Sequence, residues 1–246
     1  MKTNVPKILH WVWFNFADPS EESEPPAHRI PFQESWIKQH SDWEVKVWKD
    51  AEARRLMEQH YKSFLELYDS YPSPIFRADM IRYFILYHFG GLYVDWDFYC
   101  FRNTEKLFDG DSQFYAFHEP PEHAAGTAVN NGLMAAVKGS DFIWSVIEAL
   151  RPAPGNSFFD VLDTTGPGFL SPIANSDKRA SIGSYDLVMP HSAFSRHKMQ
   201  ASAAYRESIF RETNCYALHV WDGSWGGVLD RGMNRPRFNR RRLRLD

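Results

Sequence analysis

Residues 77–97 read RADMIRYFILYHFGGLYVDWD, and this stretch decides the fold. From residue 75 to residue 89, apolar side chains recur at the spacing of a helix with one buried side. Gly90 and Gly91 end that helix, because glycine readily takes the left-handed conformation that a helix C-terminus often needs. Residues 92–98 follow as a strand. The stretch therefore predicts the helix, turn and strand of a layered α/β domain.

Asp95 and Asp97 stand at the end of the predicted strand. Side chains at i and i+2 of a strand point to the same side, so the two carboxylates project together while Val94 and Trp96 face the opposite layer. Carboxylate oxygens suit Mg²⁺ or Mn²⁺, and either ion can hold a diphosphate. An Asp-x-Asp triplet alone is equally an ordinary strand end or cap. The helix, glycine pair and strand before it favour the metal site.

Shorter patterns on both sides continue the alternation of strands and helices. The sequence predicts strands at residues 7–14, 43–48, 92–98, 113–117, 130–137 and 215–221, helices at 35–40, 50–61, 75–89 and 142–150, and loops at 18–31 and 152–185. Asp50 is expected to cap the helix that starts there, since its carboxylate can accept free amide N–H groups of the first turn.

Composition limits the classes of function. The 246 residues are 43% hydrophobic and 24% charged, which fits one soluble globular domain. The net charge of −3 argues against a general nucleic-acid binder. Two cysteines, Cys100 and Cys215, form neither a disulfide framework nor a zinc motif. No apolar run approaches the roughly 20 residues that span a bilayer, and the start lacks a signal peptide's apolar segment, so we expect a cytoplasmic protein.

The 77–97 stretch resembles the signature of the DXD-containing sugar-binding-region glycosyltransferases, a group similar to glycosyltransferase family 32. That group includes the yeast initiating α-mannosyltransferase and bacterial polysaccharide transferases, with the clostridial glucosylating toxins as distant relatives. KILHWVWF at 7–14, Trp36 with 43–48, and HVWDGSW at 219–225 resemble further segments of the family. The resemblance implies a GT-A fold: a single Rossmann-like α/β domain whose mostly parallel central sheet is flanked by helices. We expect this domain to span residues 1–230.

By this resemblance, Asp97 is the direct ligand of a Mn²⁺ or Mg²⁺ ion, and Asp95 contacts the ribose or reaches the metal through water. A C-terminal segment often completes the metal shell in GT-A enzymes, and His219 is the candidate here because imidazole suits Mn²⁺ tolerably. Asp222 or Ser224 is the alternative ligand. The ordinary alternative for His219 is a hydrogen-bonded strand histidine.

The resemblance also implies residues that bind a nucleotide-sugar donor. Asp79 is expected to bind sugar hydroxyl groups, and Arg82 to contact the sugar or the diphosphate. The two residues lie three apart, hence on one face of the helix, and an ordinary surface ion pair is the alternative. The family uses the position of Tyr93 near the donor, although an aromatic residue in a strand is usually part of the core.

Five further residues are candidates by the same resemblance. Trp13 resembles the tryptophan that stacks on the base in the toxin relatives, and Val12 offers backbone contacts; core packing is the alternative for Trp13. Asn130 and Asn131 resemble an asparagine near the transferred sugar, although Asn-Asn is also an ordinary turn. Trp225 is expected to close over the donor as part of a C-terminal lid.

The resemblance implies retaining, metal-dependent transfer of a hexose to a glycan or a lipid-linked glycan in surface polysaccharide synthesis. We expect front-face transfer, in which the departing phosphate helps to deprotonate the acceptor, because no nucleophilic carboxylate pair stands out apart from the metal site. Uridine diphosphate sugars (UDP-sugars) are favoured as donors, with guanosine diphosphate mannose (GDP-mannose) as runner-up.

Three other functions compete with this interpretation. One is an effector-type glycosyltransferase that modifies a protein, and another is a non-catalytic module that binds glycans or nucleotide-sugars. The third, a phosphatase with an Asp-x-Asp nucleophile, is disfavoured because Phe98 and Tyr99 follow the motif and because the motif is central rather than on the first strand.

Seven arginines lie between Arg231 and Arg244, within a C-terminal tail at 231–246. Such a tail can attract anionic lipid head groups, which would place the protein peripherally at the inner face of the cytoplasmic membrane. A solvated terminus is the alternative.

Overall fold

The computed structural model of the protein describes residues 4–16, 18, 21–123, 126–191 and 196–222. A six-stranded sheet forms its centre, in the order β2-β1-β3-β6-β5-β7. These strands are β1 (Ile8–Val12), β2 (Glu44–Trp48), β3 (Gly91–Val94), β5 (Phe114–His118), β6 (Val129–Ala136) and β7 (Ala180–Gly183). Strand β6 is antiparallel to both neighbours, and the other strand pairs are parallel. A small second sheet pairs β4 (Phe98–Cys100) with β8 (Ala217–His219).

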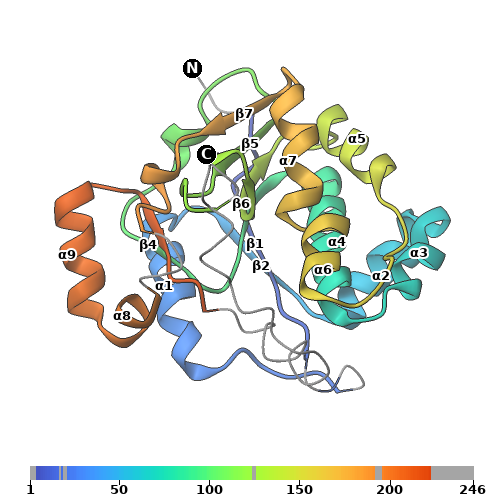
Figure 1. The fold of residues 1–246 in the computed structure, drawn as a ribbon, viewed down its shortest axis with the longest axis horizontal. Coiled ribbons are helices and arrows are strands. Elements are labelled where there is room, and N and C mark those ends of the chain that lie inside the picture. The colour runs from blue at the N-terminus through green and yellow to red at the C-terminus, as the bar shows by residue number, and fades with distance from the viewer. Residues whose placement is uncertain (1–3, 17, 19–20, 124–125, 192–195, 223–246) are drawn as a thin grey trace, which may run out of the picture.

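Helices cover both faces of the central sheet (Figure 1). One side holds α2 (Asp50–His60), α3 (Leu65–Ser70), α4 (Pro74–Phe89), α5 (Asp141–Ala149), α6 (Phe158–Thr164) and α7 (Pro167–Ser176). The other side holds α1 (Ile30–Gln39), α8 (Arg196–Ala201), α9 (Ala203–Thr213) and the small sheet. Short 3-10 helices cover Ala27–Arg29, Lys62–Phe64, Glu105–Phe108 and Tyr185–Leu187. An α/β domain with a mostly parallel sheet flanked by helices was predicted, and the structure confirms it.

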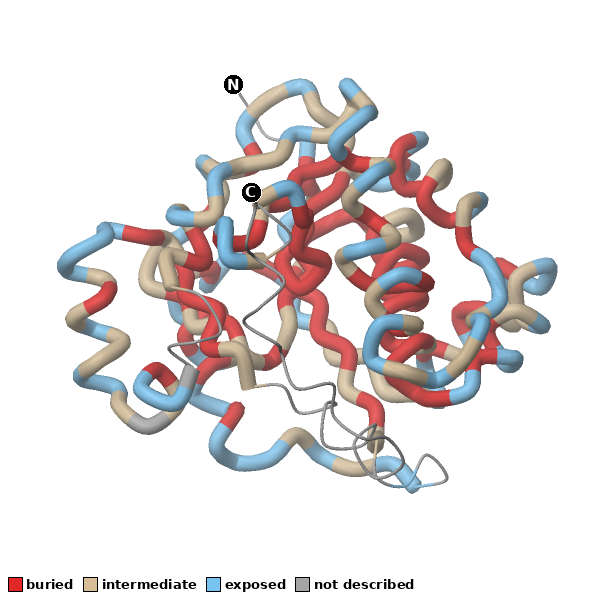
Figure 2. Tube along the Cα trace, in the orientation of Figure 1, coloured by how far each residue is buried: buried red, intermediate tan, exposed pale blue. Residues whose placement is uncertain are grey.

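Helix α4 lies inside the core, as the buried residues in Figure 2 show. Twelve of its sixteen residues are buried, so the predicted single buried side is wrong. The helix packs against β1, β3, β6 and α5, and a helix that is covered on several sides is apolar almost all round. Its position beneath the sheet holds any polar side chain of α4 next to the strands.

The glycine pair ends α4 as predicted and starts β3 against β1. Gly90 has φ +67°, and its N–H donates to the Leu86 carbonyl over 2.9 Å. Gly91 has φ +99°, and a Cβ atom there would lie 2.6 Å from the Ile8 carbonyl oxygen. Only glycine tolerates both that backbone conformation and that approach. The reversal from helix to strand therefore depends on these two residues.

His10 of β1 fixes the same turn from the side. Its Nε2 lies 2.9 Å from the Gly90 carbonyl oxygen, and its Nδ1 lies 3.2 Å from the Trp48 indole nitrogen. An indole N–H only donates, so the tautomer that satisfies both contacts is the neutral one with the proton on Nε2. Burial lowers the pKa of His10 to about 3.

We predict that His10 makes the fold acid-sensitive. Unfolded His10 binds its proton near pH 6.5 and folded His10 only near pH 3, so between these values the unfolded state holds the extra proton. The contribution to stability is complete above pH 6.5 and is lost as the pH falls toward 3. We expect the free energy of unfolding, measured with urea, to fall between pH 7.5 and pH 5. This fall should be about 2 kcal/mol larger in the wild type than in His10→Gln. Equal losses would contradict this assignment.

The Asp-Trp-Asp triplet is a turn rather than the end of one long strand. Strand β3 stops at Val94, and β4 starts at Phe98 in the second sheet, where Phe98 pairs with His219. The predicted strand over 92–98 is therefore confirmed only at 92–94 and is wrong at 95–97, which form the turn. Val94 and Trp96 nevertheless pack in the same apolar cluster, as predicted. The Trp96 indole donates to the Val12 carbonyl over 2.9 Å, which anchors the turn against the end of β1.

Other predictions differ in extent. The predicted strands at 7–14, 43–48, 113–117, 130–137 and 215–221 and the helices at 50–61 and 142–150 are confirmed with shifted ends. The predicted loop at 152–185 is wrong, since it contains α6, α7 and β7. The helix predicted from residue 35 starts at Ile30, which shortens the predicted loop before it. Asp50 is the first helical residue rather than the cap, which is Lys49.

Among the residues that the structure describes, no helix combines the length and apolarity needed to cross a bilayer. The arginine-rich segment 231–246 and the predicted lid residue Trp225 lie outside the described residues. The domain boundary at residue 230 and the membrane contact of the tail stay predictions.

Candidate functional site

Several chain segments meet at one edge of the central sheet. Strands β1 and β3 are parallel, and β5 runs in their direction because β6 is antiparallel to both β3 and β5. The C-terminal ends of β1, β3 and β5 therefore lie at the same edge, where β6 begins. This is where open α/β sheets bind ligands. The predicted residues Val12, Trp13, Asp95, Asn130 and Asn131 all lie at or next to this edge.

Asp79 and Arg82 of α4 form a buried ion pair beneath this edge. An Asp79 oxygen lies 2.6 Å from the Arg82 guanidinium, and the side chains are 7% and 4% exposed. Thr165 also donates to Asp79 over 3.3 Å, and Arg82 donates to the Asn131 carbonyl over 2.7 Å. Burial raises the pKa of Asp79 to about 6 although Arg82 acts in the opposite direction. The alternative of an ordinary surface ion pair is therefore wrong.

Arg82 links this pair to Asp95. One guanidinium nitrogen lies 3.5 Å from Asp95 Oδ1, to which the Tyr93 hydroxyl also donates over 2.5 Å. The guanidinium also lies over the Tyr93 ring, 4.6 Å from its centroid. On the other side of Asp95, a Cβ atom added to Gly132 would lie 2.5 Å from Oδ2. The sheet leaves this space open for the carboxylate, which is 32% exposed.

Asp97 pairs with His219, two residues that the resemblance assigned to one metal site. Asp97 Oδ2 lies 3.1 Å from His219 Nε2 and accepts from the Asp222 backbone N–H over 2.9 Å. Burial would raise the pKa of Asp97, but His219, Arg29 and the Asp222 N–H together hold that pKa below its usual value. The Asp97 charge in turn raises the pKa of His219 against its burial. Within the described part of the chain, His219 Nδ1 is buried without a hydrogen-bond partner.

The donor set fits a divalent cation that is completed by substrate. In the described residues, no three His, Cys, Asp or Glu side chains are placed to hold a metal ion by themselves. Mg²⁺ is usually held by one or two carboxylates together with substrate phosphates, rather than by a cage of protein ligands. Asp95 and Asp97 supply two such carboxylates, whereas Nε2 of His219 already faces Asp97. The sharing of an ion among Asp95, Asp97 and His219 stays a prediction.

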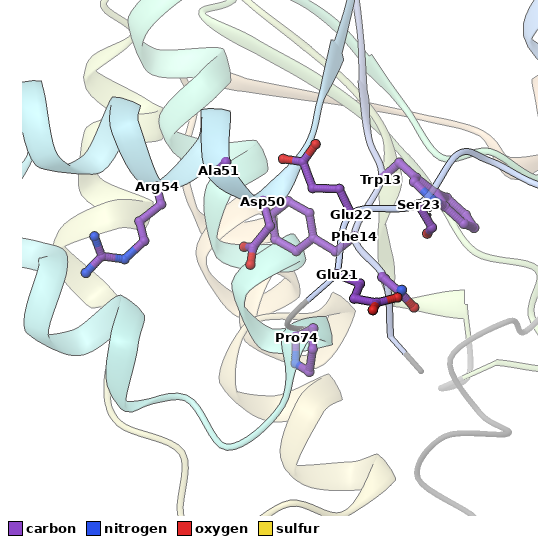
Figure 3. A pocket seen from close by; sticks show the side chains of 10 residues that line it. Trp13, Phe14, Glu21, Glu22, Ser23, Asp50, Ala51, Arg54 and Pro74 are labelled. Carbon is purple, nitrogen blue, oxygen red and sulfur yellow. Dashed lines mark hydrogen bonds between the residues drawn. The ribbon is translucent and has the colours of Figure 1, made fainter. Parts of the chain in front are cut away.

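Trp13 lines a cavity of about 180 Å³ beside the end of β1. Figure 3 shows this cavity between the loop that follows β1 and the start of α2, with carboxylates of Glu22 and Asp50 beside it. The Trp13 indole donates to Ser23 over 3.2 Å, and Arg29 lies over its ring at 5.4 Å. Its ring is partly exposed rather than fully in the core. Stacking of a base on Trp13 stays a prediction.

Val12 and the two asparagines are held by backbone structure. The Val12 carbonyl accepts from Trp96, which leaves one of its two lone pairs for another donor. Asn130 and Asn131 lie in strand β6, so the alternative of an Asn-Asn turn is wrong. Asn130 Oδ1 accepts from the Gly132 N–H over 2.8 Å, and Asn131 Nδ2 donates to the Thr165 carbonyl over 3.4 Å.

Three further polar residues lie at this edge but were not predicted from the sequence: Thr165, Glu119 and His123. Thr165 follows α6 in a segment predicted to be a loop. Glu119 directly follows β5, and its carboxylate contacts both Asn130 and His123. Its position two residues after the predicted strand at 113–117 was the signal that could have indicated it, because the C-terminal ends of such strands carry ligand-binding groups.

Comparison with known proteins identifies a family model that matches part of this site. Residues 26–114 match the model of the glycosyltransferase sugar-binding region containing a DXD motif. These residues are a DXD-type sugar-binding region. The resemblance inferred from the sequence is confirmed for these residues, and so is the predicted α/β fold with a mostly parallel sheet flanked by helices. Within the sugar-binding region lie Asp79, Arg82, Tyr93, Asp95 and Asp97, whereas Trp13, Asn130 and His219 lie outside it.

Two curated relatives of this chain are fungal. It is 31% identical over 229 residues to inositol phosphoceramide mannosyltransferase 3 of Schizosaccharomyces pombe. This alignment covers 88% of the chain and 60% of the relative. It is 31% identical over 233 residues to mannosyl phosphorylinositol ceramide synthase CSH1 of Saccharomyces cerevisiae. This alignment covers 92% of the chain and 56% of the relative. The chain thus spans less than two thirds of either relative. Among solved structures, PaToxG glycosyltransferase aligns with a TM-score of 0.48 and 15% identity, over 92% of the chain and 84% of PaToxG.

Proposed function

We propose that the protein is a metal-dependent glycosyltransferase that moves a sugar from a nucleotide-sugar to a hydroxyl group of an acceptor. The observation that carries this proposal is the connection of Asp95 to the buried Asp79–Arg82 pair through Arg82. A buried ion pair is costly to desolvate, so its retention under a ligand-binding edge is better explained by binding than by stability. Asp97 supplies the second carboxylate of the DXD motif on the same turn.

The residues divide the work as follows in this proposal. Asp95 and Asp97 would hold Mn²⁺ or Mg²⁺, which as a Lewis acid neutralises the charge that develops on the departing diphosphate. Arg82 adds a fixed positive charge next to Asp95. Asp79, whose second oxygen accepts from Thr165, offers a hydrogen-bond acceptor for sugar hydroxyls. Tyr93 orients Asp95 through its hydroxyl.

We infer that the transferred sugar is mannose, with GDP-mannose as the donor. Both fungal relatives carry mannosyl transfer in their names, and both align over most of this chain. The UDP-sugars favoured by the sequence analysis gain no support from these names. A titration of GDP and UDP, each with Mn²⁺, should show the tighter binding for GDP. Equal or tighter binding of UDP would contradict GDP-mannose as the donor and would favour a UDP-sugar.

The acceptor in this proposal is a glycolipid that carries phosphoinositol, again on the relatives' names. We keep front-face transfer with retention as the proposed course, in which a phosphate oxygen of the leaving group takes the acceptor proton. Mass spectrometry of the protein after turnover should show no covalent sugar adduct. A trapped adduct would instead indicate a double-displacement mechanism.

The proposed function is tested by incubating the protein with GDP-mannose or UDP-sugars, with and without Mn²⁺, and measuring release of the nucleoside diphosphate. Slow metal-dependent release in water, accelerated by vesicles that contain inositol phosphoceramide, is the expected result. A module that only binds the nucleotide-sugar would bind without releasing product. An effector would transfer to a protein and ignore the vesicles.

A further inference from the structure

Glu119 and His123 form a hydrogen-bonded pair that the proposed reaction has not used. His123 Nδ1 lies 3.1 Å from Glu119 Oε2, and Asn130 Nδ2 donates to the other oxygen, Oε1, over 3.1 Å. The Glu119 side chain is only 11% exposed, and that of His123 is 18% exposed. A buried carboxylate needs such partners, because removing its charge from water is costly. Both oxygens of Glu119 are thereby fixed.

Contacts connect this pair to both carboxylates of the DXD motif. Asn130 Oδ1 accepts from the Gly132 N–H, and a Cβ atom on Gly132 would meet both Asn130 Oδ1 and Asp95 Oδ2. Asn130 thus lies between the Glu119 carboxylate and Gly132, and the Asp95 carboxylate lies close against Gly132.

On its other side, the His123 ring packs edge-on against Trp221 with centroids 4.7 Å apart. Trp221 in turn lies 3.9 Å from the His219 ring, and His219 contacts Asp97. The pair therefore borders the DXD site from the side of β5 and β8, whereas Asp79 and Arg82 border it from α4.

The hydrogen bonds also determine which ring atom of His123 is available. A carboxylate only accepts, so Nδ1 carries the proton that it donates to Glu119. In the neutral imidazole, Nε2 is then a hydrogen-bond acceptor. An acceptor of fixed orientation, on a side chain that is 18% exposed, suits a hydroxyl group of a ligand.

We propose that His123 binds the acceptor, by accepting a hydrogen bond from a hydroxyl next to the one that attacks, and that Glu119 positions the imidazole. This inference rests on the proposed function and names the acceptor side of the same site. The ligand it fits is a polyol, such as an inositol or a sugar ring, which carries several neighbouring hydroxyls. His123 takes no proton in the transfer, so the proposed role of the leaving phosphate is unchanged.

The test compares His123→Gln with a matched control, His60→Gln, on the exposed C-terminal end of α2. Mannosyl transfer to inositol phosphoceramide vesicles and to soluble inositol or mannoside acceptors is measured beside donor hydrolysis in water and binding of GDP with Mn²⁺. For His123→Gln we expect the KM for the acceptor to rise about tenfold, as for one lost hydrogen bond. Donor hydrolysis and GDP binding should stay within about twofold in the same measurements. The control should match the wild type throughout.

Glu119→Gln adds a readout that a merely structural role would not move. An amide that keeps the Asn130 contact through its oxygen turns its NH₂ group toward His123, which favours the tautomer with the proton on Nε2. The ¹⁵N shifts of the His123 ring should report this exchange, and the KM for the acceptor should rise with it. Thermal unfolding confirms that both variants are folded.

Three outcomes overturn the inference. An unchanged acceptor KM in His123→Gln is the first, and a parallel loss of GDP binding is the second, since that would place His123 on the donor side. The third is a wild-type protein that transfers to none of these acceptors, which also contradicts the proposed acceptor. Failure of the wild type to bind or hydrolyse any donor would instead contradict the proposed function itself.

Discussion

Replacing Asp97 by asparagine is expected to lower metal-dependent transfer at least about 100-fold and to abolish the Mn²⁺ dependence of nucleotide binding. The amide keeps the size of the side chain and an oxygen that can accept from the Asp222 N–H. It removes the negative charge that a hard divalent cation requires. The defect should therefore appear in the metal titration while the protein remains folded. Calorimetric titration of GDP at several Mn²⁺ concentrations measures it.

Asp42→Asn is the matched control for this variant. Asp42 is also an aspartate in an ion pair, with Lys7 at 2.5 Å, but it is exposed and precedes β2 on the surface. Its replacement should leave transfer and metal dependence unchanged, since exposed ion pairs contribute little. If Asp97→Asn kept its Mn²⁺ dependence and its rate within threefold, the DXD turn would not be the metal site.

Spacing in the sequence predicts the part of this site that is built by local contacts, whereas only the family resemblance placed His219 with Asp97. Asp79 and Arg82 are three residues apart on one helix, and Gly90 and Gly91 reverse the chain directly after it. Spacing alone places such residues, because helix geometry and positive φ depend on neighbours in the chain. Asp95 follows within a few residues, so its position is set by the same helix, glycine turn and strand.

The rest depends on partners that are distant in the chain. The Asp-Trp-Asp turn reads as strand because its residues alternate, yet Phe98 pairs with His219 of β8, which draws β4 into a second sheet. Glu119 is held at the site by a hydrogen bond from Asn130, which lies in β6 and is 11 residues away in the chain. Periodicity contains no information on such pairings. The Pro, Gly, Ser and Asp residues of 152–185 indicated a loop, although Ser157 and Asp160 form a capping box at the start of α6 and α7 packs against β6.

Replacing Arg82 by methionine is expected to destabilise the fold by about 3–5 kcal/mol at pH 8, because it leaves the Asp79 carboxylate buried without its partner. Arg82 is 4% exposed and also donates to the Asn131 carbonyl, so no water can replace it easily. Urea unfolding at pH 8 measures this loss. Donor binding should be lost as well, since the positive charge beside Asp95 is gone.

The destabilisation should depend on pH in a defined direction. Folded Asp79 has a pKa of about 6 in the wild type, above the value of 3.8 expected when unfolded, so the folded state binds the extra proton between these values. Loss of Arg82 removes the largest of the influences that lower this pKa, which extends the window upward. Below pH 5 Asp79 is then neutral in both proteins, and the two stabilities should converge. The double variant Asp79→Asn/Arg82→Met should recover stability at pH 8 but not donor binding. A penalty that is independent of pH would show that Arg82 stabilises the protein through packing alone.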